Sequence, residues 1–452
     1  MTLVTASTLL GVVLIVATQI QSGDQPTAVW WPLLPNLSIA FTVEPLGLLF
    51  AGVASFLWLV TSVYSIGYMR GHGESNQTRF YVYFAIAIAS AIGVAFAGNM
   101  LTLFIFYEAL TLSTFPLVTH HGSAEAKRAG RTYLGILLTT SIGAQLLAIV
   151  WTWQLTGTLD FVQGGIMADV DSPIASVLLV LYVFGIGKAA LMPFHRWLPA
   201  AMVAPTPVSA LLHAVAVVKA GVFSILKVAI YLFGTERLST LASADLLAYV
   251  AALTIIAASL VALRKDNLKA RLAYSTISQL GYVVLGALLA NRWGIIGGSM
   301  HIVMHAFGKI TLFFCAGAIL VATHKTEISD MRGLGRAMPV TMGAFLVGTL
   351  SIIGLPPTGG LWSKWYLALG TLHTEQIELL GVLLVSSLLN VAYLLPIPIR
   401  AFFGQPADGA PAVIREAPLP SLVALVITAF ACIVLFFYPQ PLYRLVVGLG
   451  DL

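Results

Sequence analysis

Long apolar runs separated by short polar loops constrain this chain more than any other feature of its sequence. A run of about 17 to 25 apolar residues can cross a bilayer as a helix, and we place about thirteen of them. They lie near residues 3–20, 46–67, 80–98, 100–119, 131–153, 174–197, 206–233, 245–263, 271–290, 294–322, 339–370, 377–400 and 420–447. Only 9% of the residues are charged, whereas ordinary globular domains have about 25%. The pattern therefore predicts an all-α integral membrane protein.

Basic residues divide unequally between the two alternating sets of loops. One set carries only Arg237, Arg292 and Arg444. The other carries Arg70, Arg79, Lys127, Arg128, Arg131, Arg196, Arg264, Lys265, Lys269, Arg271, Lys325, Arg332, Arg336, Arg400 and Arg415. Because Lys and Arg concentrate in cytoplasmic loops, we expect a cytoplasmic N-terminus and a C-terminus outside. These residues form no basic tail or domain, so the net charge of +5 does not indicate a nucleic-acid partner.

Six ionisable residues lie inside the apolar runs. They are Glu108, Lys188, Lys219, Lys227, Lys309 and Lys364. A charge at the bilayer centre costs about 2.5 to 3.5 kcal/mol on insertion scales, so each is a candidate functional residue. Five lysines and one glutamate do not cancel as ion pairs, which favours a row of lysines that lose and regain protons. For Lys227, near the outer end of its run, we instead favour a structural role in which the long side chain reaches the interface.

Two runs contain Gly/Pro breaks beside a lysine. The sequence GIGKAALMPFHRWLP surrounds Lys188, and GLPPTGGLWSKW leads into Lys364. Proline removes a backbone donor, and carbonyls freed at membrane depth are tolerated only where protein or a water-filled cavity satisfies them. An ordinary proline kink is the alternative, but two breaks beside two lysines favour hydrated pockets.

The two breaks occupy matching positions in the chain. Each is the fourth of five runs, in units at 80–233 and 245–400, and an odd number of spans places the second unit in the opposite orientation. Such inverted repeats bind ions near the membrane midplane. We predict two inverted five-helix repeats, peripheral N-terminal helices at 1–79, and a C-terminal loop with the last transmembrane helix at 401–452.

Three titratable residues recur along one helical face. His301, His305 and Lys309 lie at i, i+4 and i+8, about 6 Å apart. Imidazole exchanges protons near neutral pH, and burial favours the neutral form of lysine, so this row predicts a proton relay. Glu108 is expected to supply a counter-charge by pairing with Lys188.

Other titratable residues have weaker support. His195 follows the first break and is the best candidate to admit protons from the cytoplasm, whereas His120 and His121 are expected to be solvated boundary residues. Glu44 is interpreted as a helix-start or interface residue. Neither the histidine pair nor Cys315 and Cys432 show metal-ligand or disulfide spacing. We therefore predict no metal and no cofactor, and without a redox centre the chain would count as an enzyme only as part of a larger translocase.

Several stretches resemble a known family. FTVEPLGLLFAGVASFLWLVTSVYSIGYM, LTLFIFYEALTLSTFPLV, GKAALMPFHRWLPAAMVAPTPVSALLHAVAVVKAG, MHIVMHAFGKITLFFCAGAI and GLPPTGGLWSKW are similar to the antiporter-like membrane subunits of respiratory complex I, Mrp-type cation/proton antiporters and energy-converting hydrogenases. The resemblance implies a proton-translocating channel in a bacterial or archaeal inner membrane. It also implies a relay through Glu108, Lys188, His213, Lys219, His301, His305, Lys309 and Lys364.

The resemblance also implies partners and leaves alternatives. Family members work beside other membrane subunits of a hetero-oligomeric complex, and they move protons, with Na⁺ as a second ion that stays open. The family usually has fourteen helices, and the shorter length here suits an Mrp D-type subunit, although HAVAVVKAG also resembles the A type. The alternatives are an energy-coupling subunit partnered with a hydrogenase or inorganic-carbon uptake protein, a self-contained secondary transporter, and a scaffold whose charges lock helices together.

Overall fold

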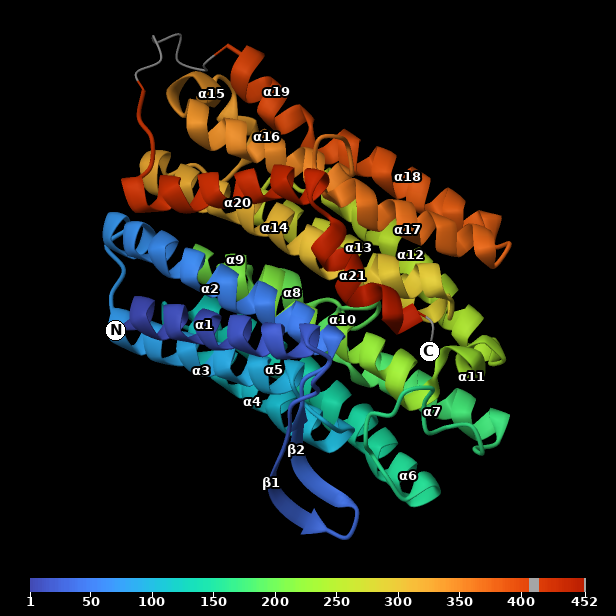
Figure 1. Cartoon of the computed structure of the whole chain (residues 1–452). Coiled ribbons are helices and arrows are strands. Elements are labelled where there is room, and N and C mark those ends of the chain that lie inside the picture. Colours follow the sequence, from blue (N-terminus) through green and yellow to red (C-terminus); the bar gives the residue numbers. More distant parts are fainter. Residues whose placement is uncertain (406–413, 451–452) are drawn as a thin grey trace.

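The computed structural model describes residues 1–405 and 414–450, so residues 406–413 of the predicted C-terminal loop and residues 451–452 lie outside it. Figure 1 shows long helices lying alongside one another, with one small hairpin at the edge. Within the described residues, ten helical segments are long and apolar enough to cross a membrane. The predicted all-α membrane fold is confirmed.

The first half of the chain contains the following elements: α1 (Thr2–Gln21), β1 (Thr27–Leu34), β2 (Leu37–Thr42), α2 (Pro45–Gly71), α3 (Gln77–Ala95), α4 (Met100–Val118), α5 (Ala124–Thr140), η1 (Ser141–Gln145), α6 (Leu146–Thr156), α7 (Ser172–Gly185), η2 (Gly187–Ala189), α8 (Trp197–Ala200), η3 (Ala201–Val203), α9 (Thr206–Leu211), η4 (Leu212–Ala216), α10 (Val217–Lys227) and η5 (Val228–Phe233). Three of the short elements, η1, η4 and η5, are π-helical.

The second half contains α11 (Thr235–Ser239), α12 (Ala242–Arg264), α13 (Leu268–Leu288), α14 (Arg292–Thr323), η6 (Ile328–Met331), α15 (Leu334–Ala337), α16 (Pro339–Ile353), α17 (Gly360–His373), α18 (Ile377–Leu394), α19 (Pro396–Phe403), α20 (Leu419–Phe437), α21 (Gln440–Val446) and η7 (Val447–Gly450). Every predicted apolar run therefore corresponds to helix. Three runs fall outside the ten spans: 174–197 and 339–370 because their helices are broken, and 271–290, which forms α13.

Helix burial separates the lipid-facing periphery from the centre. Only 11% of the most apolar window of α1 is buried, whereas that of the segment Thr206–Phe233, which contains α10, is 100% buried and that of α14 is 83% buried. Apolar side chains are stable against lipid, so exposure of α1 costs nothing in a bilayer. The lysine-bearing helices α10 and α14 thus occupy the core of the bundle.

The strands β1 and β2 form an antiparallel hairpin that the sequence interpretation missed. Its turn lies at Pro35 and Asn36, and Asn36 adopts a positive φ of 61°. Figure 1 shows the hairpin projecting from the helices, and Trp30 and Trp31 in β1 are exposed. The Asn99 side chain donates to the Ser38 backbone oxygen of β2 at 2.7 Å. The hairpin is therefore tied to the start of α4.

The first broken helix is supported by direct backbone packing. A Cβ on Gly221 in α10 would lie 2.3 Å from the Ala189 nitrogen and 2.4 Å from the Lys188 carbonyl carbon, so only glycine fits at this contact. The Trp197 indole N–H donates to the Gly187 backbone oxygen at 3.0 Å. A carbonyl released by the break is thus satisfied by protein, as membrane depth requires.

Candidate functional site

Lys188 lies in the first break and its side chain is wholly buried. Its ammonium group donates to the Tyr107 backbone oxygen at 2.7 Å and to Thr111 Oγ1 at 2.5 Å, both on α4. It also lies 3.1 Å from the centre of the Tyr107 ring. A buried amine needs such partners, and the sequence interpretation did not identify them. The spacing of four residues, which places Tyr107 and Thr111 on one helical face, was the available signal.

Glu108 does not form the predicted pair with Lys188. Both of its carboxylate oxygens are buried and have no hydrogen-bond partner among the described residues. Successive residues in a helix point about 100° apart, and Lys188 contacts the face of α4 that carries Tyr107 and Thr111. The neighbouring Glu108 therefore acts on Lys188 through its charge, without a direct bond.

The helices α10 and α14 meet at two titratable side chains. Lys219 Nζ forms a short hydrogen bond with His305 Nδ1, and both side chains are buried. This contact joins residues that are far apart in the sequence and belong to the two predicted units. The structure thus brings together two of the predicted relay residues.

A stack of rings continues from His305 along α14. The His305 and His301 rings are nearly parallel, at 5°, with centroids 5.6 Å apart, and His301 stacks on Tyr282 at 5.4 Å. His301 Nδ1 forms a 2.9 Å hydrogen bond with Ser363 Oγ, the residue before Lys364 on α17. Tyr282 and Ser363 are further site residues that the sequence interpretation missed.

The remaining two lysines each contact a different helix. Lys309 is buried and its ammonium group lies 3.3 Å from the Leu272 backbone oxygen on α13. Lys364 donates to the Ile353 backbone oxygen at 2.9 Å and to Ser387 Oγ at 3.1 Å. These two predicted relay lysines therefore contact different helices and are not gathered at one point.

Two predicted histidines lie on the first-unit side. His213 is buried in the π-helical segment η4, its two ring nitrogens have no hydrogen-bond partner among the described residues, and its ring lies near Trp197 and Tyr133. It lies beside the Trp197 that supports the first break, and its bridging role stays a prediction. His195 is partly exposed at the other end of the break, where its ring lies 6.3 Å from Tyr274.

Lys227 does not reach the interface as expected. It is wholly buried and forms a short ion pair with Glu44, whose side chain is 5% exposed. Glu44 stands immediately before α2, so its interpretation as a helix-start residue is correct in position, but the ion pair was missed. The position of a residue along its own helix does not show which neighbouring segment lies opposite it. Here the segment between α1 and α2 passes over the end of α10.

A cluster of titratable residues outside the spans surrounds Glu74. His72 and His121 each lie 3.2 Å from this carboxylate, and His120 lies 3.8 Å from it. Burial raises the pKa of Glu74, but the hydrogen bond to His121 and the nearby imidazoles outweigh it and lower the pKa overall. The Glu74 hydrogen bond raises the pKa of His121, whereas burial lowers the pKa of His120. These histidines are therefore paired with a carboxylate and not simply solvated.

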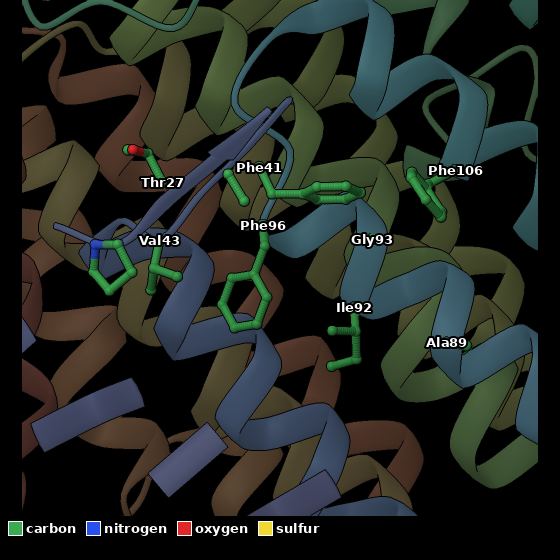
Figure 2. Close-up of a pocket in the computed structure, with 10 residues that line it drawn as sticks. Thr27, Phe41, Val43, Ala89, Ile92, Gly93, Phe96 and Phe106 are labelled. Carbon is green, nitrogen blue, oxygen red and sulfur yellow. The ribbon is translucent and has the colours of Figure 1, made fainter. Parts of the chain in front are cut away.

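One well-formed pocket lies away from the lysines. It has a volume of about 360 Å³ at the base of the hairpin and is lined by apolar groups of β2, α3 and α4. Figure 2 shows Phe41, Ile92, Phe96 and Phe106 around it. None of its lining residues is ionisable, so this pocket does not belong to the relay. Among the described residues, no group of three His, Cys, Asp or Glu side chains could hold a metal ion.

Known proteins are similar to this chain in sequence and in fold. Residues 97–390 match the family described as NADH:quinone oxidoreductase/Mrp antiporter, transmembrane, and residues 30–81 match the N-terminus of NADH-ubiquinone oxidoreductase (complex I) chain 5. NADH-quinone oxidoreductase subunit N of Desulforudis audaxviator is 35% identical, over 86% of this chain and 77% of that protein. A Na⁺/H⁺ antiporter subunit of Alkalihalophilus pseudofirmus is 31% identical, over 90% of this chain.

The relatives differ in length from this chain. Solved complexes contain chains with the same fold. The chain spans only 54% of that antiporter protein and 51% of NAD(P)H-quinone oxidoreductase chain 5 of Picosynechococcus. A chain in the structure of the Mrp complex from Dietzia is 22% identical with a TM-score of 0.87, and the alignment covers 100% of this chain and 91% of that one. Because residues 97–390, more than half of the chain, match this family, the chain belongs to the NADH:quinone oxidoreductase/Mrp antiporter membrane-subunit family.

Proposed function

We propose that this chain is a proton-translocating membrane subunit of a multisubunit cation/proton antiporter or a complex I-like assembly. The observation that carries the proposal is the buried hydrogen bond between Lys219 and His305. It joins α10, which packs on the first break through Gly221, to α14, which leads toward the second. A titratable contact between two broken-helix units is what a continuous proton path requires.

The contacts support a path in steps. Lys188 lies in the first break, and Lys219 lies two residues before the Gly221 contact with that break. From Lys219 a proton passes to His305 Nδ1, while the imidazole releases another from Nε2. The Nε2 atoms of His305 and His301 have no protein partner among the described residues, so neither nitrogen is held by a bond that proton transfer would have to break. His301 then connects through Ser363 to the helix that carries Lys364.

The orientation and partners are part of the same proposal. We place the N-terminus in the cytoplasm and the C-terminus outside, in the inner membrane of a bacterium or archaeon, as the distribution of basic loops indicates. The two relatives named above are called subunits of NADH-quinone oxidoreductase and of a Na⁺/H⁺ antiporter, which supports other membrane subunits as partners. The membrane potential alone supplies about 2.3 kcal/mol per charge per 100 mV.

The assignment of an output side also belongs to this proposal. Lys364 lies on the span that runs from the loop containing Arg336 to the loop containing Glu375 and Glu378. We infer that it marks the outer end of the relay, where an amine accepts protons without attracting Na⁺. The assignment to a D-type subunit stays a prediction, as does the division into units at 80–233 and 245–400.

The test removes the contact between the two units. Lys219→Met keeps the length and apolar stem of the side chain but cannot carry a proton. We expect the complete complex in proteoliposomes to lose at least about 90% of its proton movement, measured with an enclosed pH dye, since general acid–base groups contribute factors of about 100 to 10,000. Lys127→Met, at an exposed loop-proximal position, is the matched control. Wild-type rates in Lys219→Met would reject the proposed path.

A further inference from the structure

The buried ion pair between Lys227 and Glu44 has no place in the path described above. Lys227 is the last residue of α10, and its ammonium lies 4.0 Å from the Phe161 ring centre and 4.7 Å from that of Tyr231. The lysine is wholly buried, and the Glu44 side chain is 5% exposed. One carboxylate and two aromatic faces therefore surround a single amine.

A polar cavity reaches this pair from the surface. It has a volume of about 590 Å³, and Glu44, Phe161 and Tyr231, which enclose the amine, also line it. Its other lining groups include Asp24 and Arg444, which belong to segments after α1 and in α21. A cavity of this size with charged walls holds many water molecules. Glu44 is thus the point at which the buried pair meets solvent.

The same helix connects this pair to the relay. Lys219 and Lys227 lie eight residues apart on α10, which places them about 12 Å apart along the helix axis. Ser224 is buried between them and its hydroxyl is bonded to the Ala220 backbone oxygen. The centre of the relay and the cavity are therefore linked by one wholly buried helix.

We propose that Glu44 and Lys227 form a proton-release site that discharges α10 into this cavity on the outer face. The inference rests on the proposed proton-translocating function and adds an outlet on the first unit to the one assigned to Lys364. Its ligand is the proton, exchanged with cavity water, and no metal ion is involved.

The transfer is balanced at each step. The Lys227 ammonium gives one proton to the Glu44 carboxylate, which leaves a neutral amine and a neutral carboxylic acid. The acid then releases that proton to water in the cavity and becomes a carboxylate again. The amine regains a proton from the Lys219 end of α10. One proton therefore crosses the pair in each cycle, and both groups return to their starting states.

A purely structural ion pair makes a different prediction. Replacing a buried ion pair by uncharged groups of similar volume is often neutral or stabilising, whereas removing one partner leaves an unpaired charge. The informative variant is therefore the double change Glu44→Gln with Lys227→Met, which removes both charges together. A structural pair would tolerate it in assembly and in transport, whereas a release site would not transport.

The experiment uses the complete complex in proteoliposomes with an enclosed pH dye. We expect the double variant to assemble and melt like wild type but to move protons about tenfold more slowly, since both acid–base groups are lost. Wild-type transport in the double variant, with Lys219→Met inactive, would overturn this inference and leave the proposed function standing. A wild-type complex that moves no protons would instead reject the proposed function itself.

A second measurement applies even if the double variant fails to assemble. Gln163 lines the cavity and is exposed, so Gln163→Cys should react with a charged, membrane-impermeant thiol reagent from outside and transport should then slow. Cys315 and Cys432 are buried and free, and Ser239→Cys, at an exposed site outside the cavity, is the matched control. Labelling of Gln163→Cys without any change in transport would contradict an outlet at this cavity.

Discussion

The two broken helices satisfy the same backbone requirement with different side chains. In the first, the Trp197 indole donates to the break's own carbonyl at Gly187, and Lys188 reaches across to α4. In the second, Lys364 itself donates to the carbonyl of Ile353, while the Trp362 indole donates to the Phe436 backbone oxygen on α20. A tryptophan therefore donates to the carbonyl of the first break, whereas a lysine donates to the carbonyl of the second.

This difference gives the two lysines different roles in holding the backbone of their breaks, although the sequence pattern around them is alike. Lys188 can change its bonds to Tyr107 and Thr111 while Trp197 keeps the first break intact. Lys364 cannot leave its position without releasing a carbonyl that needs a donor. The first lysine is therefore suited to move with its proton, and the second to exchange protons from a fixed position.

The largest effect is expected at Lys188. Lys188→Ala should abolish proton movement in the reconstituted complex and leave assembly and melting temperature close to wild type, because Trp197 still satisfies the break. The pH-dye assay and size-exclusion profile are compared with those of Lys127→Ala, an exposed lysine. If Lys188→Ala fails to assemble, the distinction drawn between the two lysines is wrong.

Lys364 should combine a functional loss with a structural one. Lys364→Ala removes both the proton carrier and the donor to Ile353, so we expect blocked transport and a loss of about 1 to 3 kcal/mol in stability. Lys364→Glu restores a titratable group and should recover part of the transport but not the stability. Transport and thermal unfolding are measured on the same preparations. Equal stability in Lys188→Ala and Lys364→Ala would contradict the proposed difference between the two lysines.

The tryptophans provide the reverse test. Trp197→Phe keeps the ring but removes the indole donor to the Gly187 carbonyl. That carbonyl still accepts the Ala190 backbone N–H at 3.0 Å, so a loss of about 0.5 to 1.5 kcal/mol is expected for the one hydrogen bond. Because the break then shifts around Lys188, transport should also slow. Trp362→Phe serves as the matched variant, since its indole bonds α20 rather than its own break. It should lower stability without a comparable loss of transport.

The smallest effect concerns the cluster of titratable residues around Glu74. A lowered Glu74 pKa stabilises the fold above the ordinary carboxyl value of 4.5 and is lost as pH falls through the folded pKa. A raised His121 pKa stabilises below 6.5 and is lost as pH rises through the folded pKa. Both contributions act together between these two values, and burial of His120 opposes its protonation there.

The comparison of wild type with Glu74→Gln tests that window. The difference in melting temperature between the two should be largest near about pH 5.5 and shrink as pH rises through the folded pKa of His121, where its imidazole becomes neutral. Partly exposed ion pairs contribute only about 0 to 1 kcal/mol, so the difference should be small. A difference that does not change with pH would show that the histidines are not coupled to Glu74.

The membrane fold could be predicted from the sequence because length and apolarity decide which segments span a bilayer. The breaks were equally accessible, since Gly and Pro beside Lys188 and Lys364 act locally on the backbone. The hairpin was missed although Pro35 and Asn36 separate two β-prone runs, which is a recognised turn signal.

The contacts of the site could be predicted only in part. The spacing of His301, His305 and Lys309 placed them on one face, but the partner of each comes from a different helix: Ser363 for the first, Lys219 for the second and Leu272 for the third. Such pairings depend on how distant helices pack. Periodicity within one helix carries no information on its neighbour, which is also why the pairing expected for Glu108 and the interfacial position expected for Lys227 were wrong.

The contact at Gly221 has a mechanical consequence. Backbone atoms of the first break lie within 2.3 to 2.4 Å of where a Cβ on Gly221 would be. No side chain therefore separates α10 from the break at this contact. Close-packed interiors transmit displacement and do not absorb it. A shift of α10 by a fraction of an ångström would therefore move the backbone of Lys188 as well. Lys219 on α10 and Lys188 in the break would then move together.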